Sequence, residues 1–137
     1  MPHRESAEYL NEIEFIMFRQ WASALAIPMA LFDTQGTMLF YNEPAETLLG
    51  RRFEETGAMP ATEWSTVFTP LDDESKQIPP EALPLMITLK SQRPVYKRMH
   101  IRGLDGLAHH IEVASIPIAG LRGDFLGAAA LFWELSA

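Results

Sequence analysis

The last third of the chain restricts the possible folds most strongly, because it predicts three consecutive β-strands. Residues 95–102, 107–118 and 125–135 are rich in β-branched and aromatic side chains, and the segments between them contain glycine. Strands that follow one another through short turns pair antiparallel. The chain must therefore form an antiparallel sheet, and its remaining elements must cover that sheet.

The turn between the first two of these strands also predicts their register. A three-residue loop over 104–106, with Gly106 as the bulge residue, sets Gly103 opposite Leu107. A loop with an even number of residues would pair charged with apolar side chains, so the odd loop is favoured. One face of the hairpin is then mostly apolar and the other is charged. The predicted pairs are Met99 with Ile111 and Ile101 with His109 on the apolar face, and Arg98 with Glu112 and His100 with His110 on the charged face.

Upstream of these strands, the sequence predicts a short β-hairpin. Its strands are residues 29–32 and 37–41. In the turn between them Asp33 can start a type I turn, and Gly36 can take the left-handed conformation. The hairpin brings the predicted antiparallel sheet to five strands.

Several helices are predicted between the second and third strands. Asn42 is a typical N-cap residue for a short helix that Gly50 ends. Residues 51–78 predict short helical turns and loops, and residues 79–92 predict a further helix that Pro79-Pro80 begins. The fold class is therefore α+β, with helices inserted between strands 2 and 3 of the sheet.

A first helix is predicted from residue 6 to residue 25, where Gly and Pro are absent and apolar residues recur at helical spacing. Its apolar residues form two stripes, and one buried face needs only one. We expect one stripe to cover the outer face of the sheet and the other to meet the same helix of a second subunit. The alternative is a monomer that exposes a few aromatic side chains. The predicted homodimer interface comprises Leu10, Ile13, Phe15, Met17, Phe18, Trp21 and Leu25.

The order of these elements resembles that of PAS (Per-Arnt-Sim) domains, over residues 26–135. Residues 41–50 are similar to the start of the first inserted helix of that family, and residues 103–129 to its closing strands. Residues 83–95 resemble the long helix and its exit in PAS domains of bacterial sensor kinases and regulators. The resemblance divides the chain into an N-terminal amphipathic helix, 1–25, and a PAS domain, 26–137. It implies signal transduction, with two-component regulation as the expected setting and a signalling protein as a possible partner.

In PAS domains a ligand cavity lies between the inner face of the sheet and the inserted helices. The small side chains of 127–130 in the last strand leave volume there, which flexible Met and Leu side chains would fill only in part. A modest apolar cavity for a small lipid-like or aromatic ligand is one expectation, and a solid core is the other. The resemblance predicts as lining residues Leu31, Trp64, Phe68, Leu85, Leu89, Met99, Ile101, Val113 and Ala129.

The residue types present exclude several cofactors of the family. The chain contains no Cys, so neither the flavin photochemistry of the light-sensing subclass nor a covalently attached coumaroyl chromophore is expected. Haem-binding members usually ligate iron through a His on the long helix, and residues 79–92 contain none. Haem bound through His109 or His110 is not expected either, because a lone His on a strand is usually structural. The identity of any other cofactor is open.

No metal site or catalytic site is predicted. His100 and His110 are cross-strand neighbours, but two ligands without a nearby carboxylate or thiolate hold a metal poorly. Motifs of nucleophilic, metalloprotease and phosphate-binding sites are absent from the sequence. A small cone-shaped α+β enzyme of the steroid-isomerase type would need a buried carboxylate with a raised pKa. The inward strand positions are almost wholly uncharged, with Lys97 as the exception, so the chain is not expected to be an enzyme.

Charge and hydropathy narrow the partners further. The formal net charge of −7 disfavours binding to nucleic acid and to anionic membranes. The polar N-terminus is unlike a secretory signal, and no long apolar run follows, so a cytoplasmic location is expected. The sequence therefore predicts a homodimeric sensory domain that binds a small apolar ligand, with an adaptor for protein partners as the alternative.

Overall fold

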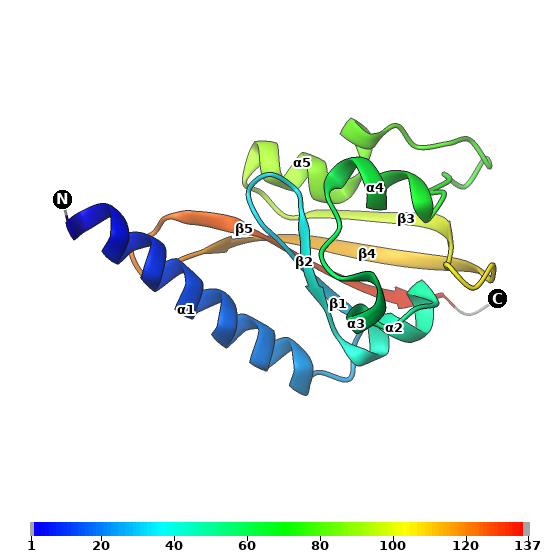
Figure 1. Ribbon diagram of the computed structural model, residues 1–137. Helices are drawn as coiled ribbons and strands as arrows, with labels where there is room; N and C mark the ends of the chain where they lie inside the picture. The colour runs from blue at the N-terminus through cyan, green and yellow to red at the C-terminus, as the bar shows by residue number, and fades with distance from the viewer. Residues whose placement is uncertain (1, 136–137) are drawn as a thin grey trace.

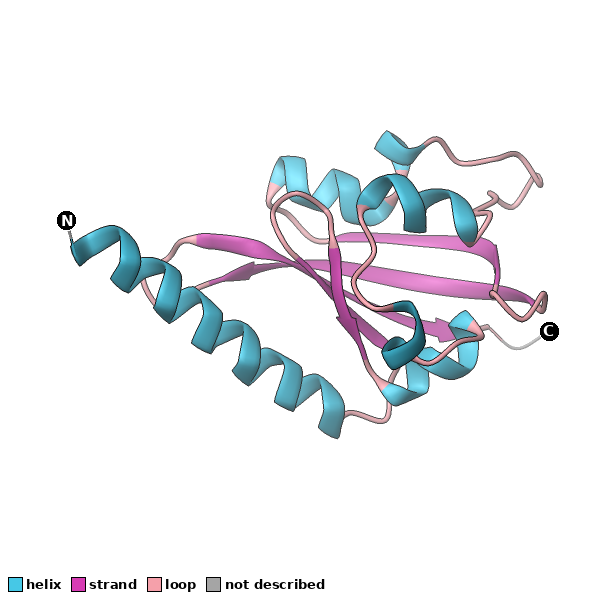
Figure 2. Ribbon diagram, in the orientation of Figure 1, coloured by secondary structure: helices cyan, strands magenta, loops and turns pink. Residues whose placement is uncertain are grey.

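A five-stranded antiparallel sheet separates two helical layers (Figures 1 and 2). The computed structural model describes the backbone of residues 2–135 and the side chains of residues 13–135. The order of strands across the sheet is β2-β1-β5-β4-β3, so the last strand lies at the centre. The strands are β1 (Met29–Phe32), β2 (Met38–Tyr41), β3 (Val95–Arg102), β4 (Ala108–Ala119) and β5 (Phe125–Glu134).

The helices inserted between β2 and β3 lie on the inner face of the sheet, and α1 (Pro2–Ala24) runs along the outer face (Figure 1). This arrangement confirms the predicted α+β fold and the predicted place of the inserted helices. The inserted helices are α2 (Glu43–Leu49), α3 (Phe53–Thr56), α4 (Ala61–Val67), the 3₁₀ turn η1 (Pro80–Ala82) and α5 (Pro84–Ser91).

The register predicted for the third and fourth strands is confirmed. Met99 lies opposite Ile111, and His100 lies opposite His110. The turn closes with a hydrogen bond from the Gly103 amide to the Leu107 carbonyl, with an N–O distance of 2.9 Å. The odd number of residues in the loop was therefore sufficient to assign each side chain of this hairpin to a face of the sheet.

The helix predicted over 79–92 is divided in two by Leu83. Leu83 has extended backbone angles, with φ −68° and ψ 141°, and the α-helix begins only at Pro84. A residue that precedes proline is disfavoured in the helical conformation, because the proline ring clashes with it. The predicted helix began at Pro79-Pro80, whereas α5 begins at Pro84.

Two hydrophobic clusters hold the layers together, one on each face of the sheet. The inner cluster joins the sheet to the inserted helices and contains Ala128 and Ala130 of β5. The outer cluster joins the sheet to α1 and contains Ala129. Small side chains at these three positions allow helices to approach the central strand from both sides.

Asn42 connects four segments of the chain at the centre of the fold. Its side-chain oxygen accepts hydrogen bonds from the backbone amides of Met29 and Ala45, at 3.0 and 3.1 Å. Its side-chain nitrogen donates to the carbonyl oxygens of Ala22 and Ile27, both at 2.9 Å. The predicted N-cap of α2 therefore also ties α1 and β1 to that helix, and it is 1% exposed.

Within the part of the chain that the structure describes, no helix has both the length and the apolar character needed to cross a membrane.

Candidate functional site

An apolar cavity of about 100 Å³ lies between the inner face of the sheet and the helices above it. The sheet contributes its wall from β1, β3, β4 and β5, and α4, the 68–70 segment and the start of α5 close it from the other side. Every described residue in the lining has an apolar side chain. The lining comprises Phe32, Leu49, Trp64, Phe68, Pro70, Leu83, Pro84, Leu85, Met99, Ile101, Ile111, Val113, Ala130 and Phe132.

Trp64 of α4 is fixed in this lining by two contacts. Its indole N–H donates a 2.7 Å hydrogen bond to the carbonyl oxygen of Gly36. Its ring meets Phe32 edge to face, with ring centroids 5.2 Å apart. The one polar group on the Trp64 side chain is thereby satisfied away from the cavity, which leaves an apolar surface for a ligand.

The structure brings together six of the nine residues that the sequence analysis assigned to a ligand cavity. Leu89 is only partly buried, and it packs against the edge of the same core near Gly36 instead of lining the cavity. The six residues in the lining are Trp64, Phe68, Leu85, Met99, Ile101 and Val113.

The assignment of Leu31 and Ala129 to the inner face was wrong. They lie opposite each other on β1 and β5, and both belong to the cluster beneath α1. Their neighbours Phe32 and Ala130 point into the cavity instead. Each strand alternates between faces, so an error of one residue exchanges the two sets.

Two aromatic residues that the sheet contributes to the cavity wall, Phe32 and Phe132, were not predicted. Met and Leu side chains were expected to fill the inner face, but these two rings join Trp64 and Phe68 there. Phe132 lies opposite Val113, a residue assigned correctly to the inner face. The register of β3 with β4 was predicted from the sequence, but that of β4 with β5 was not. A correct register for β4 with β5 would have placed Phe132 in the lining.

The residues predicted for a dimer interface divide between two surfaces of α1. Phe15, Phe18 and Leu25 are partly buried and pack on the outer face of the sheet, next to the fully buried Ala22. Met17 and Trp21 are exposed, and Ile13 is half-buried. Leu10 lies outside the residues whose side chains are described. The two predicted stripes are therefore distinct, and over residues 13–25, where side chains are described, one of them packs on the sheet while the other is largely exposed.

A groove runs beside the exposed stripe, between α1 and the outer face of β4 and β5. Phe18 and Trp21 line it from the helix, and Ile116, Ala129 and Leu131 line it from the sheet. A second hollow continues it toward the turn between β4 and β5, where the Glu14 carboxylate accepts a hydrogen bond from the Leu121 amide at 3.3 Å. The outer face of the sheet thus retains an uncovered apolar strip along α1.

His109 lies on the inner side of β4 but does not line the cavity. Its Nδ1 is 2.7 Å from a carboxylate oxygen of Glu134 on the neighbouring strand. Its Nε2 is buried without a hydrogen-bond partner among the described residues. Neither His109 nor His110 is among the residues that line the cavity, so neither is placed to ligate a group bound in it.

The expectation that no carboxylate lies near His100 and His110 was wrong. The two rings stack on the outer face with centroids 4.1 Å apart, and Asp73 reaches both of them. Asp73 belongs to the segment 51–78, for which only short helical turns and loops were predicted. The bridge between Leu71 and His100, which brings this loop to the edge of β3, has no local sequence signal.

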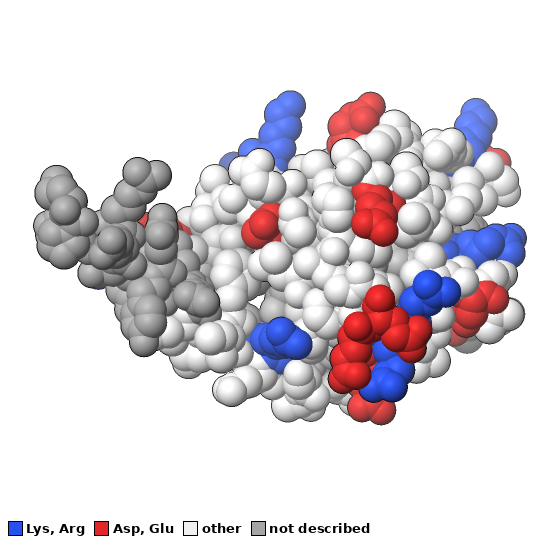
Figure 3. All heavy atoms as spheres, viewed as in Figure 1, with Lys and Arg blue, Asp and Glu red and all other residues white. Residues whose placement is uncertain are grey.

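Charged side chains are mixed in sign on the face of the molecule shown in Figure 3. The densest group on that face lies over α2 and α3 and combines Arg51 and Arg52 with acidic neighbours. Arg52 pairs with Glu54 at 2.8 Å, and Arg51 pairs more loosely with Glu55 at 3.9 Å. Among the coloured residues of Figure 3, positive charge is not concentrated in a patch of the kind that binds nucleic acid.

Comparison with known proteins finds similarity in structure but not in sequence. No family model matches the chain, and no curated protein matches it. The PAS domain of BvgS from Bordetella pertussis superposes with a TM-score of 0.59 at 13% identity, and the match covers 90% of this chain and 87% of that one. The PAS domain of nitrogen regulation protein NR(II) from Vibrio parahaemolyticus gives a TM-score of 0.61 at 16% identity, over 83% and 94% of the two chains. The light-state dimer of the fungal blue-light photoreceptor Vivid gives a TM-score of 0.62 at 10% identity, over 80% and 78%.

Proposed function

Because the chain has the PAS fold, we propose that it is a sensory and signalling domain that forms a homodimer through α1 and binds a small apolar ligand in its core. The observation that carries the proposal is the division of α1 into two apolar surfaces. One is buried on the sheet, and the other is exposed beside an apolar groove. Vivid, a photoreceptor whose structure is that of a dimer, and NR(II), a nitrogen regulation protein, share this fold and support a regulatory role.

The exposed surface of α1 and the sheet beside it have the composition of an interface. Met17 and Trp21 are 62% and 53% exposed, and Leu121 across the adjoining hollow is 89% exposed. Monomeric proteins rarely leave contiguous apolar surface of this kind in water. In a symmetric dimer, the exposed stripe of each α1 would cover the groove of its partner, so both copies would bury the same residues.

The size and chemistry of the cavity restrict the ligand. About 100 Å³ is well below the roughly 300–1,000 Å³ of pockets that enclose drug-sized ligands, so the ligand is a molecule of a few non-hydrogen atoms. The lining offers no charged or hydrogen-bonding side chain apart from Trp64, which is already paired with Gly36. Burial of apolar surface must therefore supply the affinity.

The central strand supplies a route from the cavity to α1. Ala130 of β5 lines the cavity, and its neighbour Ala129 packs beneath α1 on the other face. A ligand that displaces β5 toward the outer layer would change how α1 packs on the sheet. Such a ligand favours one arrangement of the dimer over another only to the extent that it binds the two arrangements with different affinities.

Sedimentation by analytical ultracentrifugation tests the dimer. Trp21→Glu places a charge in the proposed interface and should convert the dimer to a monomer at micromolar concentration. Ser23→Glu is the matched control, because Ser23 is exposed and lies two residues further on, about 200° around the helix. A wild-type chain that is monomeric at every concentration would contradict the proposal, and so would a Trp21→Glu chain that still dimerises. Loss of the dimer in Trp21→Glu alone would indicate that residues 1–25 act as a dimerisation segment attached to the domain 26–137.

Xenon binding tests the cavity, because xenon enters dry apolar cavities without needing a specific contact. Methyl resonances of Met99, Ile101 and Val113 should shift with xenon pressure. Ala130→Leu, which fills the cavity from β5, should abolish these shifts and leave the dimer intact. Native mass spectrometry of the purified chain would then identify a retained ligand. A wild-type chain that takes up no xenon has a solid core, and a dimeric adaptor for a protein partner would then be the function to pursue.

A further inference from the structure

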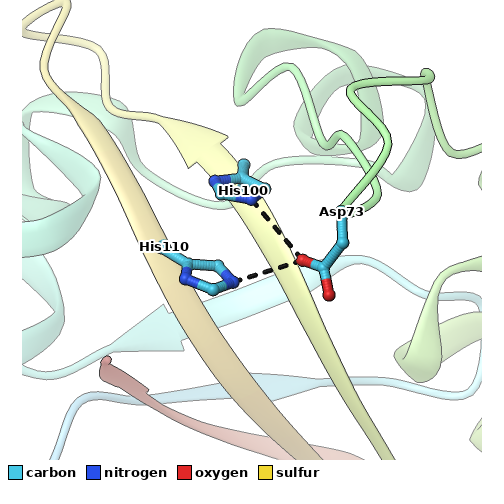
Figure 4. Close-up of side chains that lie close together, drawn as sticks. All are labelled: Asp73, His100 and His110. Carbon is cyan, nitrogen blue, oxygen red and sulfur yellow. Dashed lines mark hydrogen bonds and ion pairs between the residues drawn. The ribbon is translucent and has the colours of Figure 1, made fainter. Parts of the chain in front are cut away.

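Three possible metal ligands from three separate segments meet on the outer face of the sheet (Figure 4). His100 belongs to β3, His110 belongs to β4, and Asp73 belongs to the loop between α4 and α5. Asp73 Oδ1 lies 3.5 Å from His100 Nε2 and 3.2 Å from His110 Nε2. The three ligand atoms all lie within 4.8 Å of one another.

The sheet fixes the positions of the two histidines. They are a directly opposed pair in the antiparallel ladder, and their rings stack with an interplanar angle of 7°. In Figure 4 both rings present a nitrogen to the same side, where the carboxylate of Asp73 lies. Residues held by a regular ladder move little, so these two ligands are already in place before an ion arrives.

The loop that carries Asp73 is attached to the same strand. Leu71 exchanges two backbone hydrogen bonds of 2.8 Å with His100, which adds a short bridge to the free edge of β3. Asp72 then closes a tight turn, because its carboxylate accepts hydrogen bonds from the amides of Glu74 and Lys76, both at 2.9 Å. Asp73 is therefore held between a fixed point on the sheet and an ordered turn.

The spacing suits zinc. A tetrahedral Zn²⁺ ion holds nitrogen and oxygen ligands at about 2.0–2.2 Å, which separates neighbouring ligand atoms by about 3.4 Å. The two Asp73–His distances, 3.2 and 3.5 Å, lie on either side of that value. Two imidazoles and one carboxylate are also a donor set that zinc uses in proteins.

We propose that Asp73, His100 and His110 bind one Zn²⁺ ion. Three protein ligands leave a fourth position for water or for a donor group from another molecule. The side chains are 60%, 41% and 38% exposed, so that position faces solvent. The ion would tie the 71–77 loop to β3 and to its neighbour β4. Pro70, which lines the core cavity, directly precedes this loop, so bound zinc would also hold that part of the cavity wall.

Isothermal titration of the untagged, metal-free chain with ZnCl₂ tests the proposal. The wild type should bind one equivalent of Zn²⁺. His100→Gln, His110→Gln and Asp73→Asn should each weaken binding by at least about tenfold, since even residues that only support a ligand contribute that much. His109→Gln and Glu74→Gln are matched controls, because each is adjacent in sequence to a proposed ligand but belongs to a different contact, and both should bind as the wild type does.

Thermal unfolding gives a second measurement that does not depend on binding heat. Zn²⁺ should raise the Tm of the wild type and of both controls, because an ion bound only by the folded chain stabilises it. It should raise the Tm of His110→Gln by less, because weaker binding stabilises the folded chain less. A wild type that binds no zinc would overturn the site, and so would unchanged affinity in any one of the three ligand variants. Circular dichroism of each variant would establish that its fold is retained.

Discussion

Asn42→Ala is expected to destabilise the fold far more than its small change in volume suggests. The side chain makes four hydrogen bonds, two as an acceptor from the Met29 and Ala45 amides and two as a donor to the Ala22 and Ile27 carbonyls. A buried hydrogen bond contributes about 1 kcal/mol net, and a partner left unpaired costs about 1–3 kcal/mol. Four bonds therefore correspond to a loss of about 4 kcal/mol, a large part of the 5–15 kcal/mol that stabilises a typical domain.

Urea denaturation followed by circular dichroism measures this loss. With a slope of about 2 kcal/mol/M, the midpoint should fall by about 2 M. Asn42→Ser keeps an oxygen that can cap α2 but cannot reach both carbonyls, so it should lose about half as much. Gln20→Ala on the exposed side of α1 is the control and should change the free energy of unfolding by less than about 0.5 kcal/mol. A loss below about 1 kcal/mol for Asn42→Ala, or equal losses for the Ala and Ser variants, would refute the reasoning.

Three further changes test other parts of the fold, each by the free energy of unfolding. Gly127→Ala should cost at least about 2 kcal/mol more than Gly123→Ala, because both glycines have positive φ but only at Gly127 would a Cβ atom collide with the Phe32 carbonyl oxygen. Ser115→Ala should stabilise the chain by about 1 kcal/mol, because the buried Ser115 hydroxyl has no hydrogen-bond partner among the described residues; a loss of stability would show that the hydroxyl has one. Burial raises the pKa of Tyr41, with the hydrogen bond to Thr56 acting in the opposite direction. Above pH 10.0, the ordinary value, the unfolded chain loses the phenol proton before the native chain does, so stability should fall as pH rises, and Tyr41→Phe should flatten that fall.

Local patterns in the sequence were sufficient for the elements and for one register. The loop of odd length before Leu107 assigned each side chain of the β3–β4 hairpin to a face, and Asn42 and Gly50 marked the two ends of α2. These features are encoded within a few residues of the places where they act. The two apolar stripes of α1 were visible for the same reason, because a helix repeats every 3.6 residues whatever it packs against.

The faces of β1 and β5 were not predictable in that way. Every residue of β1 is buried, since one face of the strand meets α1 and the other meets the inserted helices. Alternation between apolar and polar residues, which identifies a strand covered on one side, is then lost. This is why Leu31 and Ala129 were assigned to the wrong side.

The sequence by itself determined the order of the elements, their approximate ends and the hairpin register, because turns, caps and periodicity act between neighbours along the chain. Only the tertiary structure decided the volume of the cavity, the face that each central residue adopts and the approach of Asp73 to the two histidines of the β3–β4 hairpin. Those properties depend on segments that are far apart in sequence and meet only when the sheet and its two helical layers have assembled.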